Sequence, residues 1–173
     1  SRATYDKAKR RYEIRDVVSV MEPYAHIDND TFTNAAAAKA LRIATQAAKL
    51  VGAEADPRWA EIAAKLYIPF SGAEQRHFPL DPGVRLHDPG DSDLTFLAFP
   101  SLDLQMDRAV RRNDYHNEVA PLLKKPGQEL TSMGLAPLTI AAATLGNPAD
   151  TARWLADNIS GDMLKAPFNV RTE

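Results

Sequence analysis

The sequence predicts a mainly α-helical chain that opens with a short β-hairpin. Apolar residues recur at helical spacing over residues 31–51 and again over 57–67, which indicates helices with one buried face. Residues that cap helices stand directly before both stretches. Helix pairs joined by polar loops favour one part of an (α/α)6 toroid, although a plain helical bundle would show the same periodicity.

Composition places the chain among globular proteins. Its 173 residues, 45% hydrophobic and 25% charged, are enough for a single domain over residues 1–173 with a hydrophobic core. The net charge of −2 gives no general attraction to nucleic acid, and no apolar run approaches the roughly twenty residues that cross a membrane. We therefore expect a soluble protein with neither partner, and the compartment (cytoplasmic, periplasmic or secreted) stays open.

A hairpin is expected within residues 1–18, because charged and apolar side chains alternate over residues 11–17 and a turn at residues 6–9 separates them from Tyr5. The turn carries the basic run Lys7–Arg11. Glu13 and Asp16 follow at once, so this run is interpreted as a solvated turn and not as a nucleic-acid site.

The first helix is expected over residues 31–51, where alanine is the most frequent residue and apolar residues recur at helical spacing. Asp30 or Thr31 would cap its start and Gly52 would end it. The second helix is expected over residues 57–67, with an aspartate before it as N-cap and proline as its first residue. Its predicted buried stripe is Trp59, Ile62, Ala63 and Leu66.

The C-terminal half predicts a long ordered loop followed by several helices. The loop covers residues 68–90, and loops of this length are usually functional or mobile. The expected helices are 104–112, 114–124, 127–146 and one from the Asn147 cap to 159. Pro137 should kink its helix or mark the first turn. The last helix should turn Trp154 and Leu155 inward, before an extended tail at 166–173.

The stretch from Val20 to Asn34 is the strongest candidate for chemistry. Glu22 lies in a loop among apolar neighbours, which could raise its pKa as a general acid requires. A loop glutamate is otherwise most often a solvated surface residue. Asp28 and Asn29 come next, and their more frequent role is to cap the following helix, which does not exclude contact with a ligand.

This stretch resembles the segment of glycoside hydrolase family 65 in which E-Y/W-H-x-x-V-D/N-N-x-x-Y-T-N carries the general acid. The tail at 166–173, A-P-F-N-V-R-T-E, is similar to the family's P-P-F-N-V-W-T/S-E. Two weaker similarities lie between them, at 59–70 and 93–100. The family contains disaccharide phosphorylases, acid trehalases and glucosyl-galactosyl-hydroxylysine glucosidases.

The resemblance implies hydrolysis of an α-linked glucosyl saccharide with inversion. Glu22 would protonate the leaving oxygen and Glu173 would activate water, with the two carboxyl groups about 6.5–9.5 Å apart. Implied substrate contacts are Tyr24, Asp28, Asn29, Asp91 and Thr131. No metal is expected, because the histidines show no metal-ligand spacing, and no cofactor is expected, because the sequence has no P-loop or dinucleotide fingerprint.

Departures from the family pattern favour a second hypothesis, a non-catalytic carbohydrate-binding or structural helical domain. Tyr24 stands where His is usual, Gly90-Asp91 replaces a Lys-Gln pair, and Arg171 replaces a tryptophan. A plain helical interaction module is a third possibility. Phosphorolysis is disfavoured, because residues 127–133 lack histidine and Glu129 would repel phosphate.

Size bears on the partner. A complete toroid of six helix pairs needs roughly twice this many residues, and the chain resembles only the second half of the family's catalytic domain. Half a toroid would expose apolar stripes, so we expect self-association or a missing N-terminal half.

Overall fold

The computed structural model describes residues 2–19, 24–84, 107–123, 132–159, 164–166 and 169–170. The chain divides into two compact units. The described part of the first covers 2–19, 24–71 and 77–84, and that of the second covers 72–76 and the described residues from 107 onward. The prediction of a mainly helical chain with an N-terminal hairpin is confirmed. None of the helices in these ranges is long and apolar enough to span a membrane.

The predicted hairpin is present in the first unit. Strands β1 (Ala3–Asp6) and β2 (Arg11–Ile14) pair antiparallel, with Tyr5 opposite Tyr12. The two tyrosine rings lie 4.9 Å apart between centroids, a distance at which aromatic rings attract each other. This cross-strand pair supports a ribbon that is too short to be stable alone.

Helix α1 (Thr31–Leu50) begins and ends close to where the sequence predicts. Asp30 is the N-cap, and its side chain accepts a hydrogen bond from the Thr33 amide at 2.6 Å. The C-cap is Val51, and Gly52 follows with φ of +68°, a conformation that glycine adopts without strain.

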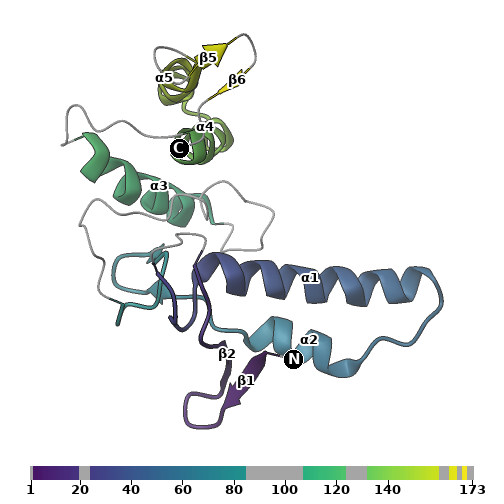
Figure 1. Ribbon diagram of the computed structural model, residues 1–173. Coiled ribbons are helices and arrows are strands. Elements are labelled where there is room, and N and C mark those ends of the chain that lie inside the picture. Colours follow the sequence, from purple (N-terminus) through teal and green to yellow (C-terminus); the bar gives the residue numbers. More distant parts are fainter. Residues whose placement is uncertain are drawn as a thin grey trace. The chain divides into compact units, whose positions relative to one another are not determined.

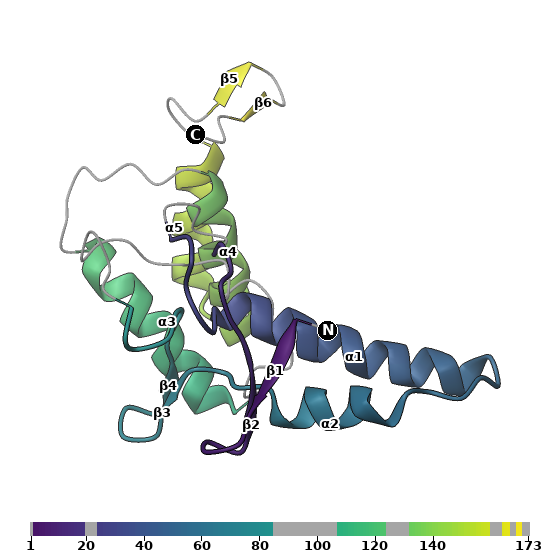
Figure 2. The ribbon, with the colours of Figure 1, turned by 60° about the horizontal axis from the view of Figure 1, so that its bottom comes forward.

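Helix α2 (Pro57–Lys65) runs beside α1, as both ribbon views show (Figure 1, Figure 2). The Asp56 side chain caps it, as predicted. Ile62, Ala63 and Leu66 are buried as expected, whereas Trp59 is only partly buried. The small core that joins β2, α1 and the end of α2 consists of Ile14, Ala38 and Leu66. Trp59 lies in the first turn of α2, at the end away from this core.

The expected loop after α2 contains two short strands, β3 (Phe70–Ser71) and β4 (Arg76–His77), which pair with each other. The chain then returns to the start of α1. The Thr31 amide donates to the Pro79 carbonyl at 3.0 Å, and the Thr31 hydroxyl donates to the Phe78 carbonyl. The loop is therefore ordered as far as residue 84, and the rest of its predicted range lies outside the described residues.

In the second unit, helix α3 (Arg108–Leu123) replaces the two helices predicted over 104–112 and 114–124. Asp107 caps it, because its carboxylate accepts from the Ala109 amide at 2.7 Å. Asn113 does not interrupt the helix, since its side chain donates to the Gln75 carbonyl at 3.0 Å and leaves the helical backbone bonds intact.

Helices α4 (Ser132–Leu145) and α5 (Pro148–Ile159) follow, with Pro137 inside α4. Asn147 accepts from the Asp150 amide at 3.1 Å and caps α5, as predicted. Trp154 is buried, but Leu155 is 48% exposed, so the prediction that both face inward is wrong for Leu155. One residue step rotates about 100° around a helix, and the hydrogen bond of Trp154 selects the buried side.

The tail is extended where it is described. Strands β5 (Leu164–Ala166) and β6 (Asn169–Val170) pair antiparallel with each other. Residues 171–173 lie outside the described part.

One hydrogen-bond chain fixes α3 to α5. Trp154 Nε1 donates to Tyr115 Oη at 2.7 Å, and Tyr115 Oη donates to Asp150 Oδ2 at 2.9 Å. Burial raises the pKa of Tyr115 to about 12, so the hydroxyl remains a donor at every pH at which proteins are usually studied.

We expect Tyr115→Phe to lower the free energy of unfolding by about 1–3 kcal/mol, because it leaves the indole and a carboxylate without their shared partner. Urea unfolding followed by fluorescence measures the change. Tyr5→Phe is the matched control, since Tyr5 is partly exposed and should lose less than about 0.5 kcal/mol. Equal losses in the two variants would contradict this role for Tyr115.

Candidate functional site

The predicted site residues divide into those that the structure describes and those that it does not. Glu22, Glu173, Asp91 and Thr131 lie outside the described residues, so their roles stay predictions. Tyr24, Asp28 and Asn29 are described, and all belong to the first unit. The site can therefore be built from the chain on both sides of residues 20–23.

Three backbone hydrogen bonds between two pairs of residues bring the flanks of residues 20–23 together. Val17 and Ile27 form an antiparallel bridge, with amide-to-carbonyl distances of 2.9 and 3.1 Å in the two directions. Nearer to Glu22, the Ser19 amide donates to the Tyr24 carbonyl at 2.9 Å. We call residues 16–19 and 24–29 the loop stem. It is a short two-sided ribbon that begins at the end of β2.

The loop stem contains three non-glycine residues with positive φ. Asp16, His26 and Asn29 have φ of 55°, 57° and 58°. Asp, Asn and His are the side chains that adopt this conformation most readily, at a cost of order 1 kcal/mol each. The His26 ring lies 2.7 Å from the Asp16 carboxylate, and both side chains are exposed. Local strain of this kind persists only where surrounding contacts hold the backbone.

The three described site residues lie in different environments. Tyr24 is buried. Asp28 is 52% exposed, and its carboxylate accepts from the Asp16 amide at 3.1 Å. Asn29 is buried, and its backbone amide donates to the Ile14 carbonyl at 2.8 Å. The more frequent role considered for Asp28 and Asn29, capping of the helix, belongs instead to Asp30.

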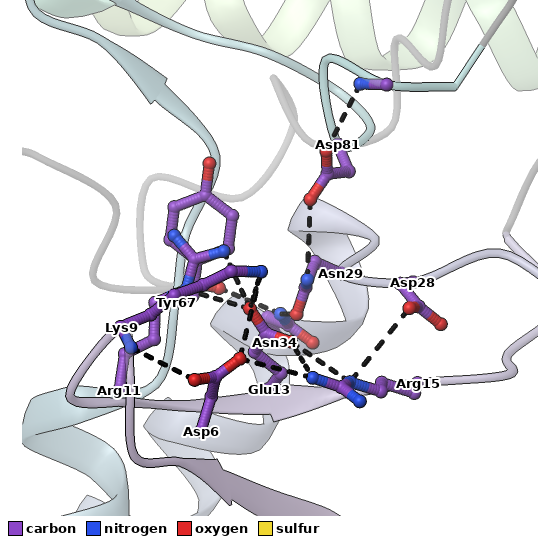
Figure 3. A network of polar contacts seen from close by, with 11 residues as sticks. Asp6, Lys9, Arg11, Glu13, Arg15, Asp28, Asn29, Asn34, Tyr67 and Asp81 are labelled. Atoms are coloured by element: carbon purple, nitrogen blue, oxygen red, sulfur yellow. Dashed lines mark hydrogen bonds and ion pairs between the residues drawn. The ribbon is translucent and has the colours of Figure 1, made fainter.

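A buried polar chain connects the loop stem to α1. Asn34 donates through Nδ2 to the Tyr67 carbonyl at 2.8 Å and to Asn29 Oδ1 at 3.3 Å (Figure 3). Asn29 in turn donates to Asp81 Oδ2 at 3.4 Å. Both neighbours of the Asn34 amide are acceptors, which fixes its orientation and leaves Asn34 Oδ1 as a buried oxygen without a hydrogen-bond partner among the described residues.

Below the loop stem, Glu13 is 1% exposed and neutralised by three cations. Its carboxylate oxygens lie 2.6 Å from Arg11 Nη2, 2.7 Å from Arg15 Nη2 and 3.0 Å from Lys9 Nζ (Figure 3). Burial acts to raise the pKa of Glu13, but hydrogen bonds from these cations outweigh burial and lower the pKa to about 2.

The basic run Lys7–Arg11 is therefore more than a solvated turn, and that interpretation is corrected. The Arg11 guanidinium also lies over the Tyr67 ring, 3.4 Å from its centroid. Lys9 and Arg11, two cations of the run, supply counter-charge to the Glu13 carboxylate. Without counter-charge, burial of this carboxylate would destabilise the fold. The carboxylate belongs to β2, one residue before the carbonyl that receives the Asn29 amide.

Sequence reasoning missed a second buried charged group, in the second unit. Arg111, Asp114 and Glu118 are all buried on α3. Arg111 Nη1 lies 3.2 Å from Asp114 Oδ2, and burial lowers the pKa of Arg111 although Asp114 opposes this. Their spacing of three and four residues places them on one face of the helix, which is the signal that could have found them.

Among the residues that the structure describes, no group of three or more His, Asp or Glu side chains could hold a metal ion. Asp81 illustrates the alternative use of such residues. Its carboxylate accepts from the Gly83 amide at 3.1 Å and from the Asn29 side chain, so it organises the loop after β4.

Comparison with known proteins links the chain to enzymes that act on glucosyl saccharides. It is 36% identical over 117 residues to a protein-glucosylgalactosylhydroxylysine glucosidase of Danio rerio. The aligned region covers 66% of this chain and 17% of that protein. It is 30% identical over 167 residues to a kojibiose hydrolase of Mucilaginibacter mallensis, covering 94% of this chain and 23% of the relative. A periplasmic/secreted acid trehalase of Candida glabrata is 29% identical over 98 residues, 56% of this chain and 8% of that protein.

No family model matches the sequence. The chain spans about a fifth of the length of the first two relatives. All of these relatives are glycosidases, and the second similarity extends over nearly the whole chain. The chain is therefore a relative of glycoside hydrolases.

The cations around Glu13 lead to a pH prediction. A carboxylate whose pKa is lowered by folding stabilises the protein above its ordinary pKa, near 4.5, and this contribution disappears as the pH falls towards 2. We expect Glu13→Gln to cost about 2 kcal/mol at pH 7, because three cations lose their counter-charge. The difference from the wild type should shrink steadily between pH 4.5 and pH 2.

Denaturant unfolding at a series of pH values measures this difference. Glu61→Gln is the matched control, since Glu61 forms an exposed pair with Lys65 and should change stability by less than about 0.5 kcal/mol. A Glu13→Gln cost that does not change with pH would show that the ion cluster does not stabilise the fold.

Proposed function

We propose that the chain is part of a glycoside hydrolase of family 65 that cleaves an α-glucosidic bond with inversion. The observation that carries the proposal is the 30% identity to a kojibiose hydrolase over 94% of this chain. The braced loop stem on both sides of residues 20–23 supports it, because a catalytic acid needs a fixed position. We further propose that the helices belong to the second half of an (α/α)6 toroid.

In this mechanism the carboxylic acid of Glu22 gives its proton to the oxygen that leaves the sugar. A water molecule attacks the anomeric carbon from the opposite face, and Glu173 accepts a proton from that water. The acid must stay protonated near neutral pH, and its apolar sequence neighbours would raise its pKa by removing water. No metal or cofactor takes part in these steps.

The described residues suggest how the sugar would be held. Asp28 is half-exposed, so we assign it a hydrogen bond from a sugar hydroxyl. Tyr24 and Asn29 are buried, so we assign them the support of the loop stem ahead of direct contact. Contacts from Asp91 and Thr131 remain part of the proposal by resemblance.

The second candidate is a carbohydrate-binding or structural domain without catalysis. Two departures from the family 65 pattern favour it. Gly90 stands in place of a lysine and cannot supply its ammonium donors, and Arg171 stands in place of a tryptophan and cannot supply its aromatic stacking surface. A phosphorylase remains disfavoured, because the Glu129 carboxylate would repel phosphate.

For a partner we propose either a second copy of this chain or additional chain of the kind that the longer relatives contain. Exposed apolar residues on α1 support this, since Ile43 is 52% exposed and Leu50 is 88% exposed. The glucosyl ligand and this partner are distinct parts of the proposal.

The central test is Glu22→Gln. We expect glucose release from kojibiose, nigerose or trehalose to fall at least about 100-fold, because glutamine cannot donate a proton to the leaving oxygen. Glu54→Gln is the matched control, since Glu54 lies exposed in the connection between α1 and α2 and should leave the rate unchanged.

Binding of a glucose-mimicking iminosugar, measured by calorimetry, separates the two candidates. A wild type that binds the iminosugar but releases no glucose supports the non-catalytic domain. If the wild type neither binds the iminosugar nor releases glucose, both carbohydrate-related functions are contradicted.

A further inference from the structure

One buried hydrogen bond joins the loop stem to helix α1. Ser19 Oγ donates to Asp30 Oδ2 at 2.9 Å, and both residues are buried. The two residues are eleven positions apart in the sequence, so no local pattern requires them to meet. A hydrogen bond to a charged carboxylate is stronger than a bond between neutral groups.

Each oxygen of the Asp30 carboxylate has a different task. Oδ1 accepts from the Thr33 amide at 2.6 Å and caps the helix, while Oδ2 receives the Ser19 hydroxyl. Capping needs only one oxygen, and serine or threonine supplies it at many helix starts. The bond to Ser19 is therefore separable from the cap, and it orients the loop stem relative to the first turn of α1.

Ser19 also has two tasks. Its backbone amide donates to the Tyr24 carbonyl, and we call this pair, Ser19 and Tyr24, the neck of the loop stem. Its hydroxyl fixes the neck to Asp30. The start of α1 is itself held from another side, because Thr31 bonds to the carbonyls of Phe78 and Pro79. The neck is thus fixed to a helix terminus that cannot easily shift.

We propose that Ser19 and Asp30 are positioning residues for the general acid. The inference rests on the proposed function, because the residues between Ser19 and Tyr24 include Glu22. Neither residue touches the substrate in this account. They set the direction of the loop neck, and misplacement of a catalytic group by about 1 Å can lower a rate about 100-fold.

The test is Ser19→Ala, which removes the bond to Asp30 and leaves the helix cap intact. We expect kcat to fall about 10- to 100-fold with KM changed less than about two-fold, since about 1.4 kcal/mol corresponds to a factor of ten. Ser19→Thr keeps the hydroxyl and should restore most of the rate. Thr45→Val is the matched control, because among the described residues the Thr45 hydroxyl bonds only to the Leu41 carbonyl of its own helix, at 2.9 Å.

Amide hydrogen exchange provides a readout that does not depend on activity. In Ser19→Ala the amide of residue 19, which bonds to the Tyr24 carbonyl, should exchange about ten-fold faster. The amides of Val17 and Ile27, in the bridge below, should stay protected. Faster exchange at residue 19 alone shows that the bond to Asp30 holds the neck.

Three results would overturn the proposal: unchanged exchange at residue 19, a fall in kcat that Ser19→Thr does not restore, or an equal fall in Thr45→Val. If the wild type releases no glucose, the proposed function fails, and a role in positioning a general acid fails with it. Exchange at residue 19 then still decides whether the bond to Asp30 holds the neck, because faster exchange upholds this and unchanged exchange overturns it.

Discussion

The first unit depends on the carboxylate of Asp30, which binds the first turn of α1 with one oxygen and the loop stem with the other. A buried carboxylate is stable only when donors surround it, and here those donors come from the first turn of α1 and from the first arm of the loop stem. Thr31, the next residue, bonds to the chain that returns after β4. The start of one helix therefore organises three stretches of chain, and the segment containing Glu22 leaves from one of them.

Glu13 is a second buried carboxylate that is surrounded by donors, and it lies on β2, next to the start of the loop stem. Its three cations come from the hairpin turn, from β2 and from the residue after β2, so the ion cluster fixes the strand from which the loop stem begins. Ile14 follows Glu13 directly, and its carbonyl accepts the amide of Asn29. The ion cluster in the hairpin and the loop stem are therefore directly connected through residues 13 and 14. Two cations of the basic run have a structural role, which the composition of the run does not reveal.

The sequence predicted the features that depend on neighbouring residues. The hairpin, helices α1 and α2, and the caps Asp30, Asp56 and Asn147 follow from local patterns, and all are confirmed. Long-range contacts could not be predicted. Asn113 looked like a break between two helices because its distant carbonyl acceptors were unknown, and the outward turn of Leu155 depends on the Tyr115 hydroxyl. For the proposed site, the sequence singled out the segment around Glu22, whose role stays a prediction, but not Ser19, because the partner of Ser19 lies eleven residues away.

The proposed function requires two carboxylic acids that act on opposite faces of a glucosyl ring, and the stereochemistry of the product tests this arrangement most directly. Proton NMR of the sugar that is first released from an α-linked disaccharide such as kojibiose distinguishes the two anomers before they equilibrate. Attack by water on the face opposite to the leaving oxygen predicts β-glucose as the first product. Initial release of α-glucose would contradict the account, since it requires a covalent intermediate and two carboxyl groups in a different geometry.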